Sequence, residues 1–388
     1  MKLTWINFLH FYQPYSADNE TIIEATEKSY KRIIGALTRN PNIKFTFNIT
    51  GCLIDRWQEL GYGRLISDIK KLIESGRVEI TGSAAFHPVL ALLPESEIKR
   101  QIRLNEEILK KHFGVGLKLN GFFIPEAAYD KKLAKLIKKR GYDWLMLDEI
   151  SAYGKINAVD YGKIYIDKYS KLKLLFRSRK FSKSYVPKTI MELIKKGEDK
   201  IAVTATDAEL YGLRHNDISA TLEKLLKKPE IATETVSEYL AGLTAKEIIK
   251  PVPSSWESTE EELRRKKPYY LWADKQNKIQ VKLWQLANLA VKTVNKYKED
   301  VNYSWAREHL DKGLASCTFW WASASDFRLF SPISWNPDEI ERGVNELIRS
   351  IRALDDVTTR PTKIKAEKLY IKIKKMIWQK HWKYYWKK

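Results

Sequence analysis

Short apolar runs alternate with longer segments of helical periodicity over the first two thirds of the chain. The runs at Leu3–Leu9, Ile43–Ile49 and Asp199–Asp207 have the length and residue types of β-strands, and a last strand is predicted over Ile231–Leu240. Between the strands, segments such as "GRLISDIKKLIESG" place their apolar residues on one side of a helix. Strands that alternate with helices in this way form parallel β-α-β units. The sequence therefore predicts an α/β sheet or barrel.

The pattern changes near Pro251, where helical periodicity replaces the alternation of strands and helices. A polar, aromatic connection is followed by several helical stretches, one of which has a clear start at Asn336, immediately before Pro337. We therefore predict an α/β domain over residues 1–250 and a helical domain over residues 251–388.

The last segment, "KIKAEKLYIKIKKMIWQKHWKYYWKK", contains ten lysines and one glutamate. Leu369, Ile373 and Ile377 fall on one side of a helix, so the tail is predicted to be a basic amphipathic helix. Such a helix either lies on an anionic membrane or nucleic acid, or packs on its own domain with its lysines in water. We favour packing on the helical domain.

Composition narrows the class of protein. The chain has 388 residues, 44% of them hydrophobic, which is enough for a large core. It contains no apolar stretch of the roughly 20 residues that a membrane span needs, and its first segment lacks the small-residue cleavage site of a signal peptide. Cys52 and Cys317 lie far apart and match no metal-binding spacing, so neither a disulfide nor a zinc site is expected. We predict a cytoplasmic protein.

The formal net charge of +21 raises the question of a nucleic-acid partner. Lysine is nevertheless spread along the whole chain and mixed with glutamate, a composition typical of heat-adapted proteins. We therefore interpret the charge as a feature of a thermophile and do not expect nucleic acid to be a partner.

Several polar residues directly follow predicted strands. In parallel α/β domains, functional groups gather beyond the carboxyl ends of the strands. This rule selects the following residues: His10, Glu79, His87, Glu126, Asp148, Glu149, Asp207 and Glu209. Glu126 is notable among them because Pro125 ends the preceding strand and leaves the carboxylate at its rigid end. The alternative is that Glu126 only places a negative charge at the start of the next helix.

A second carboxylate in the same kind of position favours a functional role for Glu126 over a purely structural one. Asp207 also ends an apolar strand, in "TATDAELYGLRH". Two carboxylates at one edge of a sheet are the minimum for cleaving a glycosidic bond: one attacks the anomeric carbon or activates water, and the other protonates the leaving oxygen.

Five segments, in order, give the chain a resemblance to glycoside hydrolase family 57, which contains amylases, branching enzymes and 4-α-glucanotransferases. They are "HFYQP" (10–14), "GRVEITGSAAFHPVL" (76–90), "GFFIPE" (121–126), "DAELYGLRH" (207–215) and, more loosely, "SCTFWWASASD" (316–326). The resemblance covers about residues 1–350. Tyr12 replaces a histidine of the first family segment and Phe123 replaces a tryptophan of the third, which affects the expected sugar contacts more than the two acids.

The resemblance implies an incomplete (β/α)7 barrel with parallel strands, followed by a C-terminal helical domain. It also implies a retaining double-displacement reaction without cofactor or metal. Glu126 matches the position of the family's nucleophile, and Asp207 matches that of its general acid/base.

Further residues suit contacts with a sugar substrate. Histidine, glutamine and glutamate side chains bond hydroxyls, and tryptophan stacks on the apolar faces of pyranose rings. The predicted substrate-binding residues are His10, Gln13, Glu79, His87, His215, Trp256, Trp320 and Trp321. For each histidine the alternative is a structural role, and with thirteen tryptophans in the chain most must belong to the core.

Three functions of different classes stay open. The first is a retaining enzyme acting on an oligosaccharide or polysaccharide, with linear α-1,4-glucan as the expected substrate, either as an amylase-like hydrolase or as a 4-α-glucanotransferase. The second is a metal-dependent deacetylase, which ranks low because the chain lacks the required His-x-x-x-His pair. The third is a non-catalytic glycan-binding protein on the same scaffold. Retention of both acids favours the first.

Overall fold

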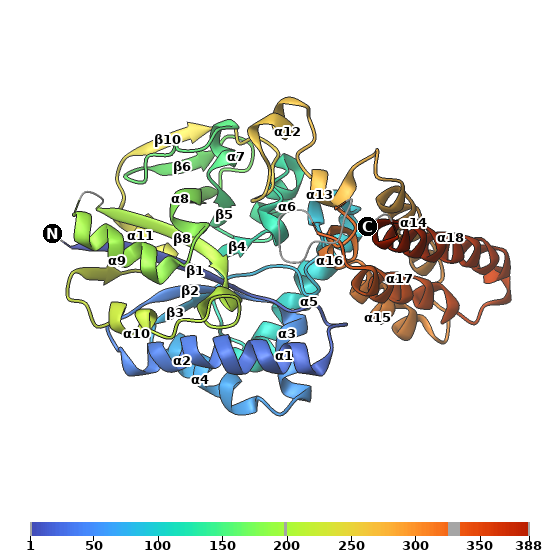
Figure 1. The fold of residues 1–388 in the computed structure, drawn as a ribbon, viewed down its shortest axis with the longest axis horizontal. Coiled ribbons are helices and arrows are strands. Elements are labelled where there is room, and N and C mark those ends of the chain that lie inside the picture. The colour runs from blue at the N-terminus through green and yellow to red at the C-terminus, as the bar shows by residue number, and fades with distance from the viewer. Residues whose placement is uncertain (1, 198–199, 325–333, 387–388) are drawn as a thin grey trace. The chain divides into compact units, whose positions relative to one another are not determined.

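The structure, a computed structural model, describes residues 2–197, 200–324 and 334–386 (Figure 1). Residue 199 of one predicted strand, residues 325 and 326 of the fifth family segment and residues 387 and 388 of the tail lie outside this description. The chain divides into two compact units. The first comprises Met1–Gln13, Ala17–Ala85 and Leu90–Leu263, and the second comprises Pro14–Ser16, Phe86–Val89 and Arg264–Lys388.

One sheet of the first unit is built around its first strand, β1 (Leu3–Phe11). β1 runs parallel to β2 (Phe45–Ile49) on one side and to β8 (Ile201–Asp207) on the other. β3 (Val78–Ile80) extends the sheet beside β2, and β9 (Ile231–Thr233) pairs with the first residues of β1. Nearly every residue of β1 is buried, as expected for a parallel strand covered on both faces.

A second sheet contains the later strands. β4 (Gly121–Phe123), β5 (Trp144–Asp148) and β7 (Lys173–Arg177) are parallel neighbours in that order. β6 (Ile164–Asp167) runs antiparallel to β7, which the sequence pattern did not predict, and β10 (Lys246–Ile249) is the outer strand beside β6.

Short joins connect the two sheets into a ring. The backbone of Gly82 bonds that of Gly121 and Phe123 at 2.9 Å each, which links β3 to β4. At the other join, the N–H of Ser178, which directly follows β7, donates to the carbonyl of Val203 on β8 at 3.0 Å. The strands β1, β2, β3, β4, β5, β7 and β8 thus follow one another around the ring. The prediction of an incomplete (β/α)7 barrel with a helical C-terminal region is confirmed.

Apolar side chains from alternate strand positions fill the inside of the ring, among them Ile6, Phe8, Met146 and Val203, all almost fully buried. Helix α11 (Val236–Gly242) contributes to the same cluster. The strand predicted over Ile231–Leu240 is therefore wrong beyond Thr233. The reason is local: Thr235 and Glu238 form a capping box, which starts a helix.

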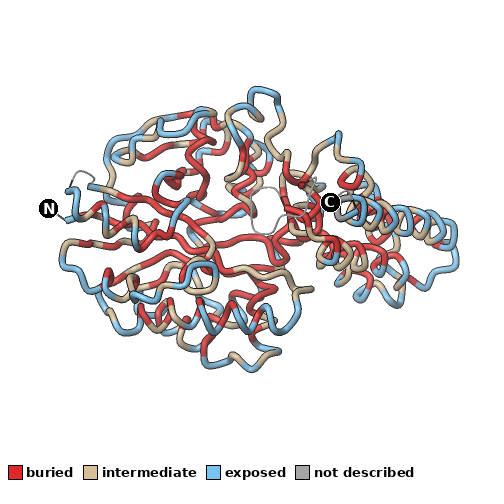
Figure 2. Tube along the Cα trace, in the orientation of Figure 1, coloured by how far each residue is buried: buried red, intermediate tan, exposed pale blue. Residues whose placement is uncertain are grey.

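The other helices of the first unit surround these strands, and their buried sides face the sheet (Figures 1 and 2). They are α1 (Asn19–Ala25), α2 (Lys31–Arg39), α3 (Gly51–Glu59), α4 (Gly63–Glu74), α5 (Glu95–Phe113), α6 (Lys131–Lys139), α7 (Ile150–Tyr153), α8 (Arg179–Ser182), α9 (Val186–Lys196) and α10 (Thr221–Leu225). A π-helical turn (Thr26–Tyr30) joins α1 to α2, and α12 (Glu260–Arg264) lies at the end of the unit.

The second unit is helical. It contains α13 (Tyr270–Ala273), α14 (Lys278–Lys296), α15 (Tyr303–Gly313), α16 (Ser316–Trp320), α17 (Pro337–Arg352) and α18 (Arg360–Tyr385). The predicted start of α17 is confirmed, because the Asn336 side chain accepts the backbone N–H groups of Asp338 and Glu339.

Helix α18 contains most of the lysine-rich tail. Ala366, Ile373 and Ile377 are fully buried and give it one side that packs against α14 and α17. This is the packing that the apolar spacing of the tail indicated. Among the described residues, no helix combines the length and hydropathy needed to cross a bilayer.

Candidate active site

The carboxylate of Glu126 stands directly beyond β4. Pro125 ends the extended backbone, and Glu126 lies in a tight turn (Pro125–Ala127) with φ 61° and ψ 14°. A left-handed conformation is costly for a residue with a Cβ, and such strain concentrates at functional sites. Trp256 stabilises the turn, because its backbone N–H donates to the Glu126 carbonyl at 3.0 Å.

Trp256 also holds the Glu126 side chain. Its indole Nε1–H donates to Glu126 Oε2 at 3.0 Å. A hydrogen bond to a carboxylate favours the ionised form and restricts its orientation. Trp256, which follows Glu126 by 130 positions in the sequence, therefore holds both the backbone and the half-buried carboxylate of Glu126.

Asp207, the second acid, is the last residue of β8. In the pairing of β1 with β8 its Cα partner is His10, so these two residues reach the same edge of the sheet. The side chain is 29% exposed, and Arg214 Nη1 lies 3.4 Å from its Oδ2. Asp207 thus keeps access to solvent while a cation stands beside it.

His10 connects the surroundings of the two acids. It is 3% exposed, and its Nδ1 lies 2.8 Å from Asn48 Oδ1. Its ring centroid lies 4.9 Å from that of Phe123 and 6.0 Å from that of Trp256. His10, which is aligned with Asp207, therefore packs against Phe123 and Trp256, the two aromatic residues near Glu126. The structure brings both predicted catalytic acids to one end of the barrel.

Glu209 also lies at this end; the strand-end rule selected it, but it was not among the residues predicted to act in catalysis or to bind substrate. It is 3% exposed and accepts hydrogen bonds from Gln13 Nε2 at 2.7 Å and from the Tyr30 hydroxyl at 2.5 Å. Burial raises its pKa to about 7; the Asp207 charge adds to this rise and the Arg214 charge opposes it. The signal in the sequence was its place two residues after Asp207. Gln13, a predicted site residue, is its direct partner.

Two other predicted contacts of the first unit lie in different surroundings. Glu79, on β3, accepts hydrogen bonds from the backbone and hydroxyl of Ser237 and from the Thr46 hydroxyl, and burial raises its pKa. It therefore faces the start of α11. His215 is exposed and stacks on the Tyr185 ring, with centroids 3.9 Å apart.

The remaining predicted contacts belong to the second unit. His87 is 1% exposed with φ 53°, and its carbonyl accepts the Ser316 N–H at 3.0 Å. Trp320 and Trp321 are in contact with each other, with ring centroids 4.6 Å apart, and Trp321 is buried. The contacts described here for His87, Trp320 and Trp321 are thus made within the second unit.

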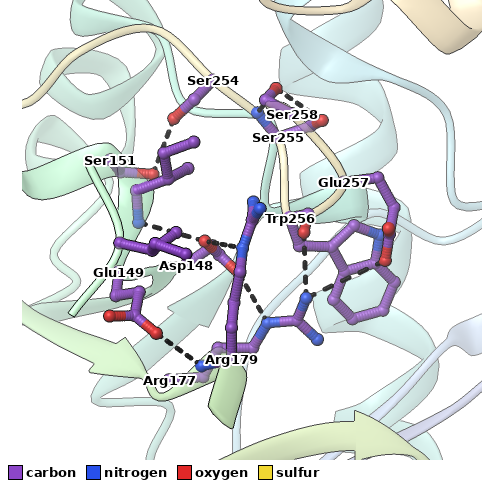
Figure 3. A network of polar contacts seen from close by, with 12 residues as sticks. Asp148, Glu149, Ser151, Arg177, Arg179, Ser254, Ser255, Trp256, Glu257 and Ser258 are labelled. Carbon is purple, nitrogen blue, oxygen red and sulfur yellow. Dashed lines mark hydrogen bonds and ion pairs between the residues drawn. The ribbon is translucent and has the colours of Figure 1, made fainter. Parts of the chain in front are cut away.

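A buried ionic network adjoins Trp256 (Figure 3). Asp148, fully buried at the end of β5, accepts from Arg177 Nε at 2.8 Å and from Arg179 Nε at 2.7 Å. Glu149 accepts the Arg179 backbone N–H at 2.6 Å. Sequence reasoning placed Asp148 and Glu149 at the strand ends but missed both arginines, because their partners are distant in the sequence.

No group of three or more histidine, cysteine, aspartate or glutamate side chains with the arrangement of a metal site occurs in the part of the chain that the structure describes. The chemistry that these residues offer is that of carboxylates, a histidine and aromatic rings at one end of the barrel. Such a set suits proton transfer and nucleophilic attack on a sugar.

Comparison with known proteins gives the family. The model of glycosyl hydrolase family 57 matches residues 5–251, so the chain belongs to this family. An α-amylase of Pyrococcus horikoshii is 23% identical over 279 residues, which are 67% of this chain and 43% of that protein. A 4-α-glucanotransferase of Thermococcus litoralis is 23% identical over 283 residues, 67% of this chain and 42% of that protein. The chain thus matches less than half the length of these relatives.

Solved structures show the same fold. The crystal structure of the 4-α-glucanotransferase from Thermococcus litoralis has a TM-score of 0.70 at 18% identity and covers 91% of this chain and 60% of that one. A family 57-type branching enzyme from Pyrococcus horikoshii has a TM-score of 0.69 at 16% identity and covers 96% of each chain.

Proposed function

We propose that the protein is a retaining glycoside hydrolase that cleaves α-1,4-glucan, with Glu126 as nucleophile and Asp207 as general acid/base. The observation that carries the proposal is that Glu126 lies just beyond β4, that Asp207 ends β8, and that one cluster of His10, Phe123 and Trp256 adjoins both. Membership of family 57 supports it, as does the likeness to α-amylases. No cofactor is required, and we expect the reaction to take place in the cytoplasm.

The reaction would proceed in two displacements. Glu126 Oε attacks the anomeric carbon while Asp207 gives its proton to the leaving glycosidic oxygen, which forms a glycosyl-enzyme ester and frees the first sugar. Asp207 then takes a proton from an incoming water as that water attacks the same carbon, and Glu126 leaves as a carboxylate. The bond between Trp256 and Glu126 keeps the nucleophile ionised and oriented in the first step.

A 4-α-glucanotransferase is the second candidate, and it differs only in the acceptor. If a sugar hydroxyl replaces water in the second displacement, the product is a new glycosidic bond. The match to the 4-α-glucanotransferase of Thermococcus litoralis favours keeping this alternative. A non-catalytic glycan-binding protein is the third candidate, and it predicts binding without turnover.

The test is the product pattern from maltoheptaose at elevated temperature. Shorter sugars with new reducing ends indicate hydrolysis, and a ladder of longer and shorter sugars with constant reducing ends indicates transfer. Glu126→Gln and Asp207→Asn are each expected to lower turnover by about three orders of magnitude or more. Glu247→Gln, a carboxylate on the outer strand β10, is the matched control and should keep wild-type turnover. Wild-type turnover in Glu126→Gln would refute the assignment.

A further inference from the structure

One buried guanidinium, that of Arg177, contacts three separate segments at this end of the barrel, and Figure 3 shows two of them, at Asp148 and at Trp256. Arg177 is the last residue of β7 and is 6% exposed. Its Nε donates to Asp148 Oδ2 at 2.8 Å, its Nη1 to the Ala205 carbonyl at 3.1 Å and its Nη2 to the Trp256 carbonyl at 3.0 Å. A planar group with donors in a fixed fork suits three such acceptors, whereas the ammonium of lysine does not.

Two of these three contacts lead to the acids of the proposed reaction. Ala205 lies on β8, two residues before Asp207. Trp256 makes two hydrogen bonds to Glu126, one from its backbone and one from its indole. The Arg177 guanidinium carbon also lies 4.9 Å from the centroid of the Trp256 ring, so the arginine fixes the ring as well as the carbonyl.

We propose that Arg177 is a positioning residue that sets the spacing of Glu126 and Asp207 by holding Trp256 and β8 to one guanidinium. The proposal rests on the function proposed for the two acids. Asp148 fixes the guanidinium itself, and it is in turn held by Arg179 and by the Ile150 N–H at 3.0 Å. Arg177 touches neither acid and acts only through its partners.

The geometry explains why positioning matters at this end of the barrel. Glu126 has a left-handed backbone that its surroundings must maintain. A misplacement of about 1 Å between a nucleophile and its acid lowers a rate by about 100-fold. Loss of the Arg177 fork would let the Trp256 segment and β8 move independently, and the carboxylates would lose their fixed separation.

A purely structural ion pair is the competing explanation, and the kinetic signature separates the two. A positioning role affects kcat far more than KM, and it moves the acidic limb of the pH profile because a poorly held Glu126 loses its indole donor. A structural role lowers the melting temperature and leaves both the kcat-to-KM relation and the pH limb of the folded enzyme unchanged.

The experiment compares Arg177→Lys and Trp256→Phe with the double variant, using maltoheptaose as substrate. Both single variants are expected to lower kcat about 10- to 100-fold, to change KM less than about threefold and to move the acidic limb to higher pH. The double variant should lose much less than the product of the two, because both changes break one chain of contacts. Trp256→Phe keeps an aromatic ring and the backbone groups that bond Glu126 and Arg177, which separates the result from a failure of Arg177→Lys to fold.

Matched controls are available elsewhere in the chain. Arg307→Lys alters a buried arginine–aspartate pair in α15, and Trp5→Phe removes a buried indole donor that bonds Thr204 at 2.8 Å near the start of β1. Both should lower stability without moving the pH limb. Wild-type kcat and pH profile in folded Arg177→Lys and Trp256→Phe would overturn the inference. Such a result would leave the proposed function intact if Glu126→Gln and Asp207→Asn are inactive in the same assays. A wild type without turnover on any glucan would overturn both the proposed function and the role of Arg177.

Discussion

Buried charges are arranged differently in the two units. In the first unit, Asp148 meets Arg177 and Arg179 from positions 29 and 31 residues away, and Arg177 reaches Trp256 across 79 residues. In the second unit, Arg307 and Asp311 form a buried pair one helical turn apart. A pair at i and i+4 stabilises one helix. A network between distant segments fixes several strand ends together, which is what a catalytic site requires.

The largest expected effect comes from breaking the long-range network at its centre. Asp148→Asn leaves two buried guanidinium groups without their shared charge, so the free energy of unfolding should fall by about 3–5 kcal/mol. Chemical denaturation measures it. Asp311→Asn, which deprives only one arginine of a local partner, should cost less. Equal losses in the two variants would contradict the contrast between the units.

The next effect concerns Glu209 and is specific to pH. Its pKa is raised in the folded protein from 4.5 to about 7, so the folded state holds the proton more tightly than the unfolded state. The resulting stabilisation is fully present below about pH 4.5 and is lost as the pH rises to about 7.

Glu209→Gln keeps an oxygen for Gln13 and Tyr30 but cannot ionise. The unfolding free energy of the wild type should therefore drop by roughly 2 kcal/mol, relative to that of the variant, between these two pH values. Melting temperatures of both proteins across the range measure the difference. Parallel curves for wild type and variant would show that Glu209 titrates alike in the folded and unfolded states.

The smallest effect is expected at the start of α17 in the second unit, where the interaction is local. Asn336→Ala removes the cap of α17 and should lower the unfolding free energy by about 1 kcal/mol. Because the cap serves one helix end, turnover of maltoheptaose by the folded variant should equal that of the wild type. Asn336→Asp, which keeps a side-chain acceptor, should restore the stability. A loss above about 3 kcal/mol in the alanine variant would mean that the cap supports more than its own helix.

Features that depend on local interactions could be predicted from the sequence. The start of α17 and the apolar side of α18 follow from local spacing, and so does the position of Glu126 beyond a strand stopped by proline. The helix at Val236–Gly242 was missed although its capping signal, Thr235 and Glu238, was present, because the apolar run before it resembled a strand.

The missed parts of the site depend on contacts between distant residues. Arg177 and Arg179 have no local signal of burial, and only the folded chain shows that both bond Asp148. Glu209 follows a predicted strand, but its burial and its bonds to Gln13 and Tyr30 appear only in the folded chain. Trp256 was predicted as a sugar contact, yet its bonds to Glu126 arise from a segment 130 residues further along the chain. Long-range hydrogen bonds of this kind leave no periodicity to detect.

The outer strand β10 has a consequence for how the protein behaves at high concentration. An unpaired strand edge is a template on which a second molecule can add its own strand. Here that edge is only four residues long, begins with Lys246 and is followed by Lys250 and Pro251. Cations repel an identical incoming strand, and proline has no N–H with which to extend the ladder. The strand that carries the exposed Ile248 thus has features at both of its ends that disfavour edge-to-edge pairing between copies of this chain.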